Sequence, residues 1–363
     1  MSLDSDLLHM RHALALGRRG LGNTWPNPAV GCVIVAENRI VGRGWTQPGG
    51  RPHAEAIALA QAGPLAQGAT AYVTLEPCAH HGHTPACAAA LIQAGIAHVV
   101  SAATDPDPRV SGQGLAMLRA AGIIVTEGVA EPEARRANAG FFSRIEQNRP
   151  QITLKLATSL DGRIATASGQ SRWITGPEAR RAVHALRGQH DAVMVGIGTA
   201  LADDPDLTIR DLGYVRQPVR VVVDSGLRLP LTSRLVQRAR EVPLWLCHAD
   251  GAQGGALQAA GVRLIPCPRS GAGLEIGDLL GHLAAAGLTR LLCEGGAGIA
   301  AALLAAGLVD ELVLFTAGRL FGAAGTAAVA NLGEVALGTP PAFQLIDQRP
   351  VGADLMQHWR RVP

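Results

Sequence analysis

His53 and Glu55 stand two positions apart and are followed by Pro77-Cys78 and then by Cys87. One imidazole and two thiolates balance the charge of Zn²⁺ and leave the fourth tetrahedral position open for water. Zinc lowers the pKa of such a water to near neutrality, and a carboxylate beside the metal can carry the released proton to a leaving amine. The residue types therefore predict a catalytic zinc site for hydrolytic deamination, with three ligands and Glu55 as the acid/base.

The spacing of these residues predicts where they lie in the fold. Residues two apart on a helix point about 200° away from each other, so His53 and Glu55 fit best at the start of a helix. The usual deaminase pattern is Pro-Cys-x-x-Cys, whereas Cys78 and Cys87 are nine positions apart and enclose a loop that contains His83. The alternative interpretation is that ordinary buried cysteines lie near an unrelated histidine.

Composition indicates a globular protein with two domains. The chain has 363 residues, 48% hydrophobic and 17% charged, and a net charge of +3. This slight charge suits a small anionic substrate, and 3% aromatic residues are few for stacking on nucleic acid. The N-terminus lacks the pattern of a signal peptide, and no apolar run is long enough for a membrane span. We expect a cytoplasmic protein with no membrane or nucleic-acid partner, and a homo-oligomer is left open.

Helical and strand-like segments alternate throughout, which predicts an α/β fold. The boundary is expected at Asn148-Arg149-Pro150, which gives domains 1–148 and 149–363. Helices are expected at Leu7–Gly17, Glu55–Ala62, Cys87–Ala94 and Ile299–Leu308, and strands at Val30–Ala36, Ala71–Leu75, Ala97–Ala103, Gly122–Thr126, Gln151–Ala157, Ala192–Val195, Val219–Val223, Pro243–Cys247 and Leu291–Cys293.

A glycine-rich segment, Glu294-Gly295-Gly296-Ala297-Gly298, follows the last of these strands and precedes a helix. Such a turn exposes backbone amides at the positive end of a helix, so it is a candidate cradle for the phosphates of a cofactor. The alternative is that the glycines only allow close packing of the helix. The segment also differs from the dinucleotide fingerprint, which belongs to the first strand of a Rossmann unit.

The sequence resembles the bifunctional deaminase-reductases of riboflavin biosynthesis over nearly its whole length. The segments that carry the resemblance in the first half are Thr24–Val33, His53-Ala54-Glu55, Pro77-Cys78 and Thr84–Cys87. The resemblance implies a cytidine-deaminase-like domain that binds one zinc through His53, Cys78 and Cys87, uses Glu55 as acid/base, and has Asn27 in its pyrimidine pocket. His83 stands where the family often has Lys or Arg, which makes it a candidate phosphate contact whose charge is partial near neutral pH.

The second half is similar to the reductase domain of the same family, which resembles dihydrofolate reductase. The matching segments are Lys155–Arg163, Trp173–Gly176, Thr199–Arg210, Asp224-Ser225 and Glu294-Gly295-Gly296. The resemblance implies NADPH contacts at Ala157, Trp173, Thr199, Asp203, Ser225, Gly296, Ala297 and Gly298. It implies contacts with a sugar phosphate substrate at Ser171, Arg187, Leu207, Arg210 and Glu294. Lys155 and Asp203 are candidates for the proton donor.

The function implied by the resemblance has two steps. Deamination of 2,5-diamino-6-(5-phosphoribosylamino)pyrimidin-4(3H)-one is followed by NADPH-dependent reduction of the ribosyl to the ribityl chain. One alternative is a zinc deaminase of a nucleoside or tRNA with a C-terminal domain that only binds. Another is a non-enzymatic zinc module, in which a fourth protein ligand would replace water.

Overall fold

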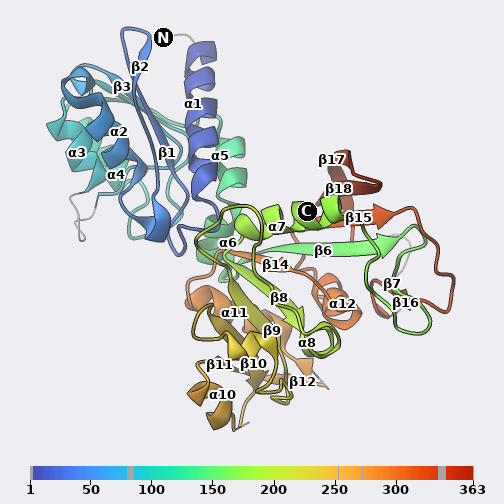
Figure 1. The fold of residues 1–363 in the computed structure, drawn as a ribbon. Coiled ribbons are helices and arrows are strands. Elements are labelled where there is room, and N and C mark those ends of the chain that lie inside the picture. Colours follow the sequence, from blue (N-terminus) through green and yellow to red (C-terminus); the bar gives the residue numbers. More distant parts are fainter. Residues whose placement is uncertain (1–2, 80–85, 252, 272, 334–340, 363) are drawn as a thin grey trace. The chain divides into compact units, whose positions relative to one another are not determined.

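The computed structural model describes residues 3–79, 86–251, 253–271, 273–333 and 341–362. The chain divides into two compact units, Met1–Gln147 and Asn148–Pro363. Both units are built from helices packed on a sheet, so the predicted α/β class is confirmed (Figure 1). Among the described residues, no helix is both long enough and apolar enough to cross a bilayer.

Unit 1 is a five-stranded sheet between two layers of helices. The strand order is β2-β1-β3-β4-β5, with β3, β4 and β5 parallel and β1 antiparallel to both of its neighbours. Figure 1 shows α1 and α5 on one face and α2, α3 and α4 on the other. The elements are α1 (Leu3–Gly17), β1 (Gly31–Ala36), β2 (Arg39–Trp45), α2 (Ala54–Ala62), β3 (Thr70–Val73), α3 (Cys87–Gln93), β4 (His98–Ser101), α4 (Gln113–Ala120), β5 (Ile124–Thr126), α5 (Glu131–Ala137) and α6 (Ala139–Gln147).

Close packing of α2 on β2 depends on a glycine. A Cβ atom at Gly44 would lie 2.0 Å from the carbonyl oxygen of Ala54, so any larger residue would push the first turn of α2 away. That turn begins directly after His53. Gly44 therefore helps to set the position of the predicted zinc ligand.

Unit 2 is a nine-stranded sheet of order β11-β10-β9-β8-β14-β6-β15-β18-β17. In this order, neighbouring strands from β11 through β15 are parallel. β18 is antiparallel to β15, and β17 is antiparallel to β18. Its larger elements are β6 (Gln151–Ser159), α7 (Pro177–Gly188), β8 (Ala192–Gly196), α8 (Ile197–Asp203), β9 (Val219–Val223), α9 (Arg234–Gln237), β10 (Leu244–Ala249), α10 (Gly255–Ala259), β11 (Arg263–Cys267), α11 (Ile276–Ala285), β14 (Arg290–Cys293), α12 (Ala297–Ala305), β15 (Glu311–Ala317), β17 (Phe343–Val351) and β18 (Asp354–Arg361).

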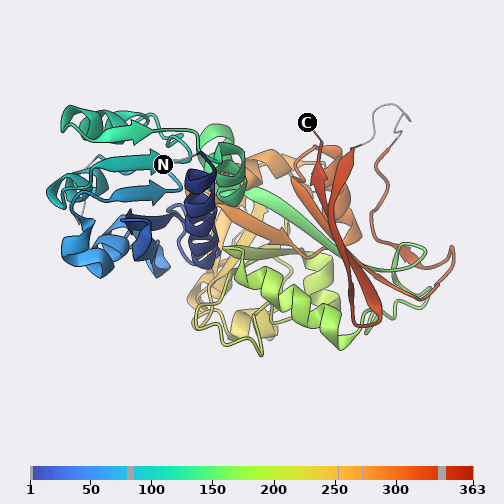
Figure 2. The ribbon, with the colours of Figure 1, turned by 90° about the horizontal axis from the view of Figure 1, so that it is seen from above.

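Short strands complete unit 2 as two separate pairs. They are β7 (Arg163–Ala165) with β16 (Thr326–Ala327), and β12 (Arg269–Ser270) with β13 (Gly273–Leu274). Helix α7 packs its apolar side on β15 and β18, where Val183 belongs to one buried cluster with Val313, Phe315 and Met356. Figure 2 shows the ribbon of this unit from above. This packing places the polar side of α7 near the ends of the parallel strands.

The expected helices and strands are present with ends shifted by a few residues. The segment just before the expected boundary, from Arg135 to Gln147, is rich in charged residues, and it forms the end of α5 and all of α6. Phe142 in α6 is 4% exposed, and the Arg135 guanidinium lies 4.1 Å from the centre of its ring. The charged residues of this segment thus lie on helices that bury an aromatic face.

Unit 2 begins with an anchored arginine. The Arg149 guanidinium donates to both carboxylate oxygens of Asp310 at 2.7 Å, and Asp310 also accepts from the Ile152 backbone N–H at 2.7 Å. These bonds fix the start of β6 beside β15. A fragment that is meant to fold as unit 2 must therefore include Arg149.

Candidate functional site

The predicted zinc ligands come together at the starts of two helices. His53 is the N-cap residue of α2, and Cys87 is the first residue of α3. The ligand atoms of His53, Cys78 and Cys87 all lie within 4.8 Å of one another. The predicted start of one helix at His53 and of another at Cys87 is confirmed.

The distances within this group fit a tetrahedral ion. His53 Nδ1 lies 3.2 Å from Cys87 Sγ and 3.7 Å from Cys78 Sγ. Zn–N and Zn–S bonds of ordinary length place such ligand atoms about 3.6 Å apart. The hydrogen bond from the Cys87 thiol lowers the pKa of the Cys78 thiol to about 4, which favours the thiolate that binds metal. The described residues present three ligands, which is the set expected at a catalytic zinc site.

Glu55 lies beside the ligands in the first turn of α2. Its side chain is buried, at 3% exposure, and lies within hydrogen-bonding distance of Cys87 Sγ. Burial raises the pKa of the Glu55 carboxyl because the charged form loses its hydration. A carboxyl group with a raised pKa can both accept and return a proton near neutral pH.

Asn27 lies in a loop that is held against the segment before His53. The Gly49 backbone N–H donates to the Asn23 carbonyl at 2.8 Å, and a Cβ atom at Gly50 would lie 1.9 Å from Asn27 Nδ2. The Asn27 side chain therefore packs on a glycine three positions before a zinc ligand. His83, the predicted phosphate contact, lies outside the described residues.

Glu76 is a buried residue beside the zinc ligands that was not predicted from the sequence. Its buried carboxylate accepts from the backbone N–H groups of Asp105, Gly112 and Gly114 at 3.2, 2.9 and 2.8 Å. These bonds hold the loop before α4 beside Cys78. Burial raises the pKa of Asp105 in this loop to about 6. The only signal in the sequence was an acidic residue directly before Pro77-Cys78.

Glu76→Gln is expected to destabilise unit 1 by ~1–3 kcal/mol, because an amide replaces a charged acceptor that several buried N–H groups share. The change should lower the temperature of the unit 1 transition in calorimetry of the full chain. Glu127→Gln is the matched control, since Glu127 forms an exposed ion pair with Arg119. An equal shift in both variants would show that the Glu76 network adds nothing.

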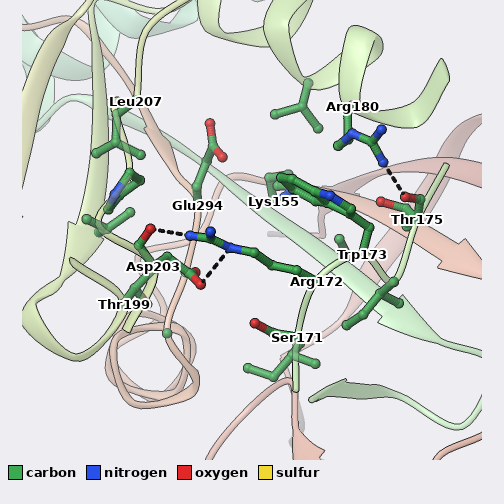
Figure 3. A pocket seen from close by; sticks show the side chains of 18 of the residues that line it. Lys155, Ser171, Arg172, Trp173, Thr175, Arg180, Thr199, Asp203, Leu207 and Glu294 are labelled. Atoms are coloured by element: carbon green, nitrogen blue, oxygen red, sulfur yellow. Dashed lines mark hydrogen bonds and ion pairs between the residues drawn. The ribbon is translucent and has the colours of Figure 1, made fainter. Parts of the chain in front are cut away.

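Unit 2 contains a cleft of about 440 Å³ beside β6 and at the ends of β8 and β14 (Figure 3). This volume suits a small ligand or part of a cofactor. Ten of the thirteen contacts predicted for this unit line the cleft: Ala157, Ser171, Trp173, Arg187, Thr199, Asp203, Leu207, Arg210, Glu294 and Gly296. Ser225, Ala297 and Gly298 are not among its lining residues, so their role stays a prediction.

Arg187 and Glu294, predicted as separate substrate contacts, form a buried ion pair. Arg187 Nε and Nη2 donate to the two Glu294 oxygens at 2.5 and 2.9 Å, and Nη1 donates to the Thr208 carbonyl at 2.6 Å. Burial alone would raise the pKa of Glu294, but the attraction of Arg187 lowers it to about 2. Arg187 thus holds Glu294 as a carboxylate in the cleft, and its own contact with the substrate stays a prediction.

Lys155 and Arg172 complete the centre of the cleft (Figure 3). Burial lowers the pKa of the Lys155 amine, and Glu294 opposes this shift. Arg172 donates to the Asp203 carbonyl, and its Nε lies 3.5 Å from the Asp203 carboxylate. The Trp173 ring, 59% exposed, lies 4.6 Å from the Arg180 guanidinium. The cleft thus combines an exposed aromatic face with several cations.

Gly296 gives the glycine-rich turn its close contact with α8. A Cβ atom at Gly296 would lie 3.1 Å from Thr199 Oγ1, and its φ of 101° is rarely adopted by other residues. The starts of α8 and α12 follow the adjacent strands β8 and β14. Their backbone N–H groups and the surrounding arginines fit the phosphates of NADPH.

Comparison with known proteins agrees with both sites. Residues 3–103 match the model of the cytidine and deoxycytidylate deaminase zinc-binding region, and residues 150–356 match that of the RibD C-terminal domain. The riboflavin biosynthesis protein RibD of Escherichia coli is 43% identical, with 97% of this chain and 98% of that protein covered. RibD of Aquifex aeolicus is 42% identical, with 89% of each covered.

Two solved structures share the fold over the whole chain. Acinetobacter baumannii RibD has a TM-score of 0.91 and 38% identity, with 100% of both chains covered. The diaminohydroxyphosphoribosylaminopyrimidine deaminase/5-amino-6-(5-phosphoribosylamino)uracil reductase of Thermotoga maritima has a TM-score of 0.87 and 33% identity, with 99% of both covered. The predicted fold and cofactors, zinc and NADPH, are confirmed, and the chain belongs to the RibD family of bifunctional deaminase-reductases of riboflavin biosynthesis.

Proposed function

We propose that unit 1 hydrolyses the 2-amino group of 2,5-diamino-6-(5-phosphoribosylamino)pyrimidin-4(3H)-one and releases ammonia. The observation that carries this proposal is the three-ligand group of His53, Cys78 and Cys87 with a buried carboxylate beside it. Zinc, when bound, activates water near neutral pH. Glu55 carries one proton from the attacking water to the ring nitrogen and a second proton from the resulting hydroxyl to the leaving amine, while Asn27 orients the pyrimidine.

Unit 2 then reduces the ribosyl chain of the deaminated product to the ribityl chain. NADPH, when bound, supplies the hydride. Trp173, Thr199, Asp203 and the turn at Gly296 line the cleft as cofactor contacts. Lys155 donates the proton that the opened sugar oxygen takes up, because burial lowers the pKa of its amine and so makes the ammonium group a stronger acid.

The remaining predicted contacts keep their assignments within this cleft. Ser171, Arg187, Leu207 and Arg210 bind the sugar phosphate. Glu294 accepts hydrogen bonds from sugar hydroxyls, and its ion pair with Arg187 holds it in place. Ser225, Ala297 and Gly298 are proposed to contact the part of NADPH that extends beyond the cleft. His83 is proposed as the phosphate contact of the deaminase.

Product analysis tests both steps at once. The full chain is supplied with the diaminopyrimidine ribosyl phosphate, with and without NADPH, and the products are identified by mass. Without NADPH only the deaminated ribosyl compound should form, and with NADPH its ribityl derivative should follow. Unchanged substrate in both reactions would reject the proposal.

The two alternative functions, a nucleoside or tRNA deaminase and a non-enzymatic zinc module, predict different properties of the chain. A nucleoside or tRNA deaminase with a non-catalytic C-terminal domain does not account for a second half that matches the RibD C-terminal domain. A non-enzymatic zinc module needs a fourth protein ligand. Zinc content measured before and after substitution of His83 tests that requirement.

We further propose that the two activities divide between residues 1–148 and 149–363. The zinc ligands all lie in unit 1, and the cleft lies wholly in unit 2. A fragment of residues 148–363, which keeps Arg149, should bind NADPH and reduce the deaminated substrate without zinc. A folded fragment that binds no NADPH would contradict this division.

The cytoplasm is the proposed location, and cell fractionation tests it. The proposed partner is the small pyrimidine substrate alone, with no nucleic acid. A homo-oligomer is compatible with the family, and light scattering of the purified chain would determine the oligomeric state.

A further inference from the structure

Three arginines converge on one buried carboxylate in unit 2. Asp206 is 6% exposed. Arg210 Nη1 lies 3.5 Å from Asp206 Oδ2, and Arg234 Nη2 donates to the same oxygen. Arg238 Nη1 lies 3.6 Å from Asp206 Oδ1 and also pairs with Glu241. Three guanidinium groups thus face two carboxylates, Asp206 and Glu241, which leaves the cluster with an excess of positive charge.

Two of these arginines face the cleft and the third does not. Arg210, Arg234 and Asp206 line the cleft, whereas Arg238 is not among its lining residues. The side chains of Arg210 and Arg234 are 54% and 53% exposed, so they have N–H groups available beyond those used on Asp206. The excess charge is therefore presented toward the space that receives the ligand.

The geometry suits a phosphate group. Because Arg210 and Arg234 both reach Asp206 Oδ2, their guanidinium groups lie close enough for the oxygens of one phosphate to accept from both. A guanidinium is a planar, permanently charged donor that binds phosphate through paired N–H groups. Asp206 stabilises both side chains in this position before the ligand arrives, which reduces the entropy lost on binding.

We propose that Arg234 is a second phosphate-binding residue of the reductase cleft, and that Arg210 and Arg234 together bind the phosphate monoester of the substrate. This inference rests on the proposed reductase function of unit 2. Asp206 is the positioning residue of the pair. NADPH carries a phosphate monoester too, so the test measures the substrate and the cofactor separately.

The test compares Arg234→Ala with Arg238→Ala in the full-length enzyme. Arg238→Ala is the matched control, since it removes a guanidinium from Asp206 without removing one from the cleft. Loss of a charge-assisted bond in Arg234→Ala should raise the substrate KM by ~10- to 100-fold and leave kcat and the KM for NADPH nearly unchanged. Arg210→Ala should behave in the same way, Arg234→Lys should recover part of the loss, and Arg238→Ala should stay within about twofold of wild type.

Binding of inorganic phosphate gives a second readout that does not require turnover. Its inhibition constant against the substrate should weaken in Arg234→Ala and not in Arg238→Ala, and calorimetry measures the same binding in an inactive protein. Circular dichroism and thermal unfolding confirm that each variant is folded. An unchanged substrate KM in folded Arg234→Ala, an equal effect of Arg238→Ala, or a rise confined to the KM for NADPH would overturn the inference. Absence of NADPH-dependent reduction by the wild type would instead reject the proposed function.

Discussion

Cys87→Ser is expected to remove most of the zinc and, with it, deamination. We expect the purified wild-type chain to carry about one zinc, held by His53, Cys78 and Cys87. A serine hydroxyl stays protonated near neutral pH and forms a shorter side chain, so it replaces a thiolate poorly as a ligand. Deamination should fall by ~10²-fold or more, since the activated water depends on the metal.

Metal analysis and two activity assays separate this effect from misfolding. Cys267→Ala is the matched control, because Cys267 is a fully buried cysteine of unit 2 outside the ligand group, and it should keep both zinc and deamination. Reduction of the deaminated substrate should persist in Cys87→Ser. Full zinc content in that variant would remove Cys87 from the ligand set.

The sequence was sufficient to predict the zinc site because its geometry is local. His53 and Glu55 belong to one helix start, and Cys87 begins another helix. The two-residue spacing of His53 and Glu55 was therefore enough to predict that both lie at the start of a helix. The resemblance to the family also identified ten residues that prove to line one cleft, although they come from segments as far apart as Ala157 and Gly296.

Contacts between distant segments could not be predicted in the same way. The bond from the Gly114 N–H, in the first turn of α4, to Glu76 spans 38 positions, and Arg187 pairs with Glu294 across 107. Neither partner carries a pattern that identifies the other. The ion pair of Arg187 with Glu294 was not predicted for this reason, whereas the role of Arg187 as a contact of the sugar phosphate substrate stays a prediction.

The charged cluster at Asp206 illustrates the same limit. Arg210 is four positions from Asp206, a spacing that sequence reasoning can pair. Arg234 and Arg238 follow β9 (Val219–Val223) and reach Asp206 only because the loop after that strand returns toward α8. The sequence spacing therefore could not predict that Arg234 and Arg238 share the Asp206 carboxylate with Arg210.

Glu55→Gln is expected to keep zinc and lose deamination by ~10² to 10⁴, the range that a positioned acid/base contributes. The amide matches the carboxylate in size, so the ligands and the start of α2 should stay in place, but it cannot accept and return a proton. Burial raises the pKa of the Glu55 carboxyl, which makes proton return near neutral pH easier.

Kinetics of both activities, with zinc content, test this role for Glu55. Deamination should fall through kcat, while reduction of the deaminated substrate stays at the wild-type rate because the cleft lies in unit 2. Glu37→Gln, in the turn between β1 and β2, is a suitable control because it changes an exposed carboxylate of the same unit. Near-normal deamination by zinc-loaded Glu55→Gln would assign the proton transfer to another group, and Asp105, whose pKa burial raises to about 6, would be the first to test.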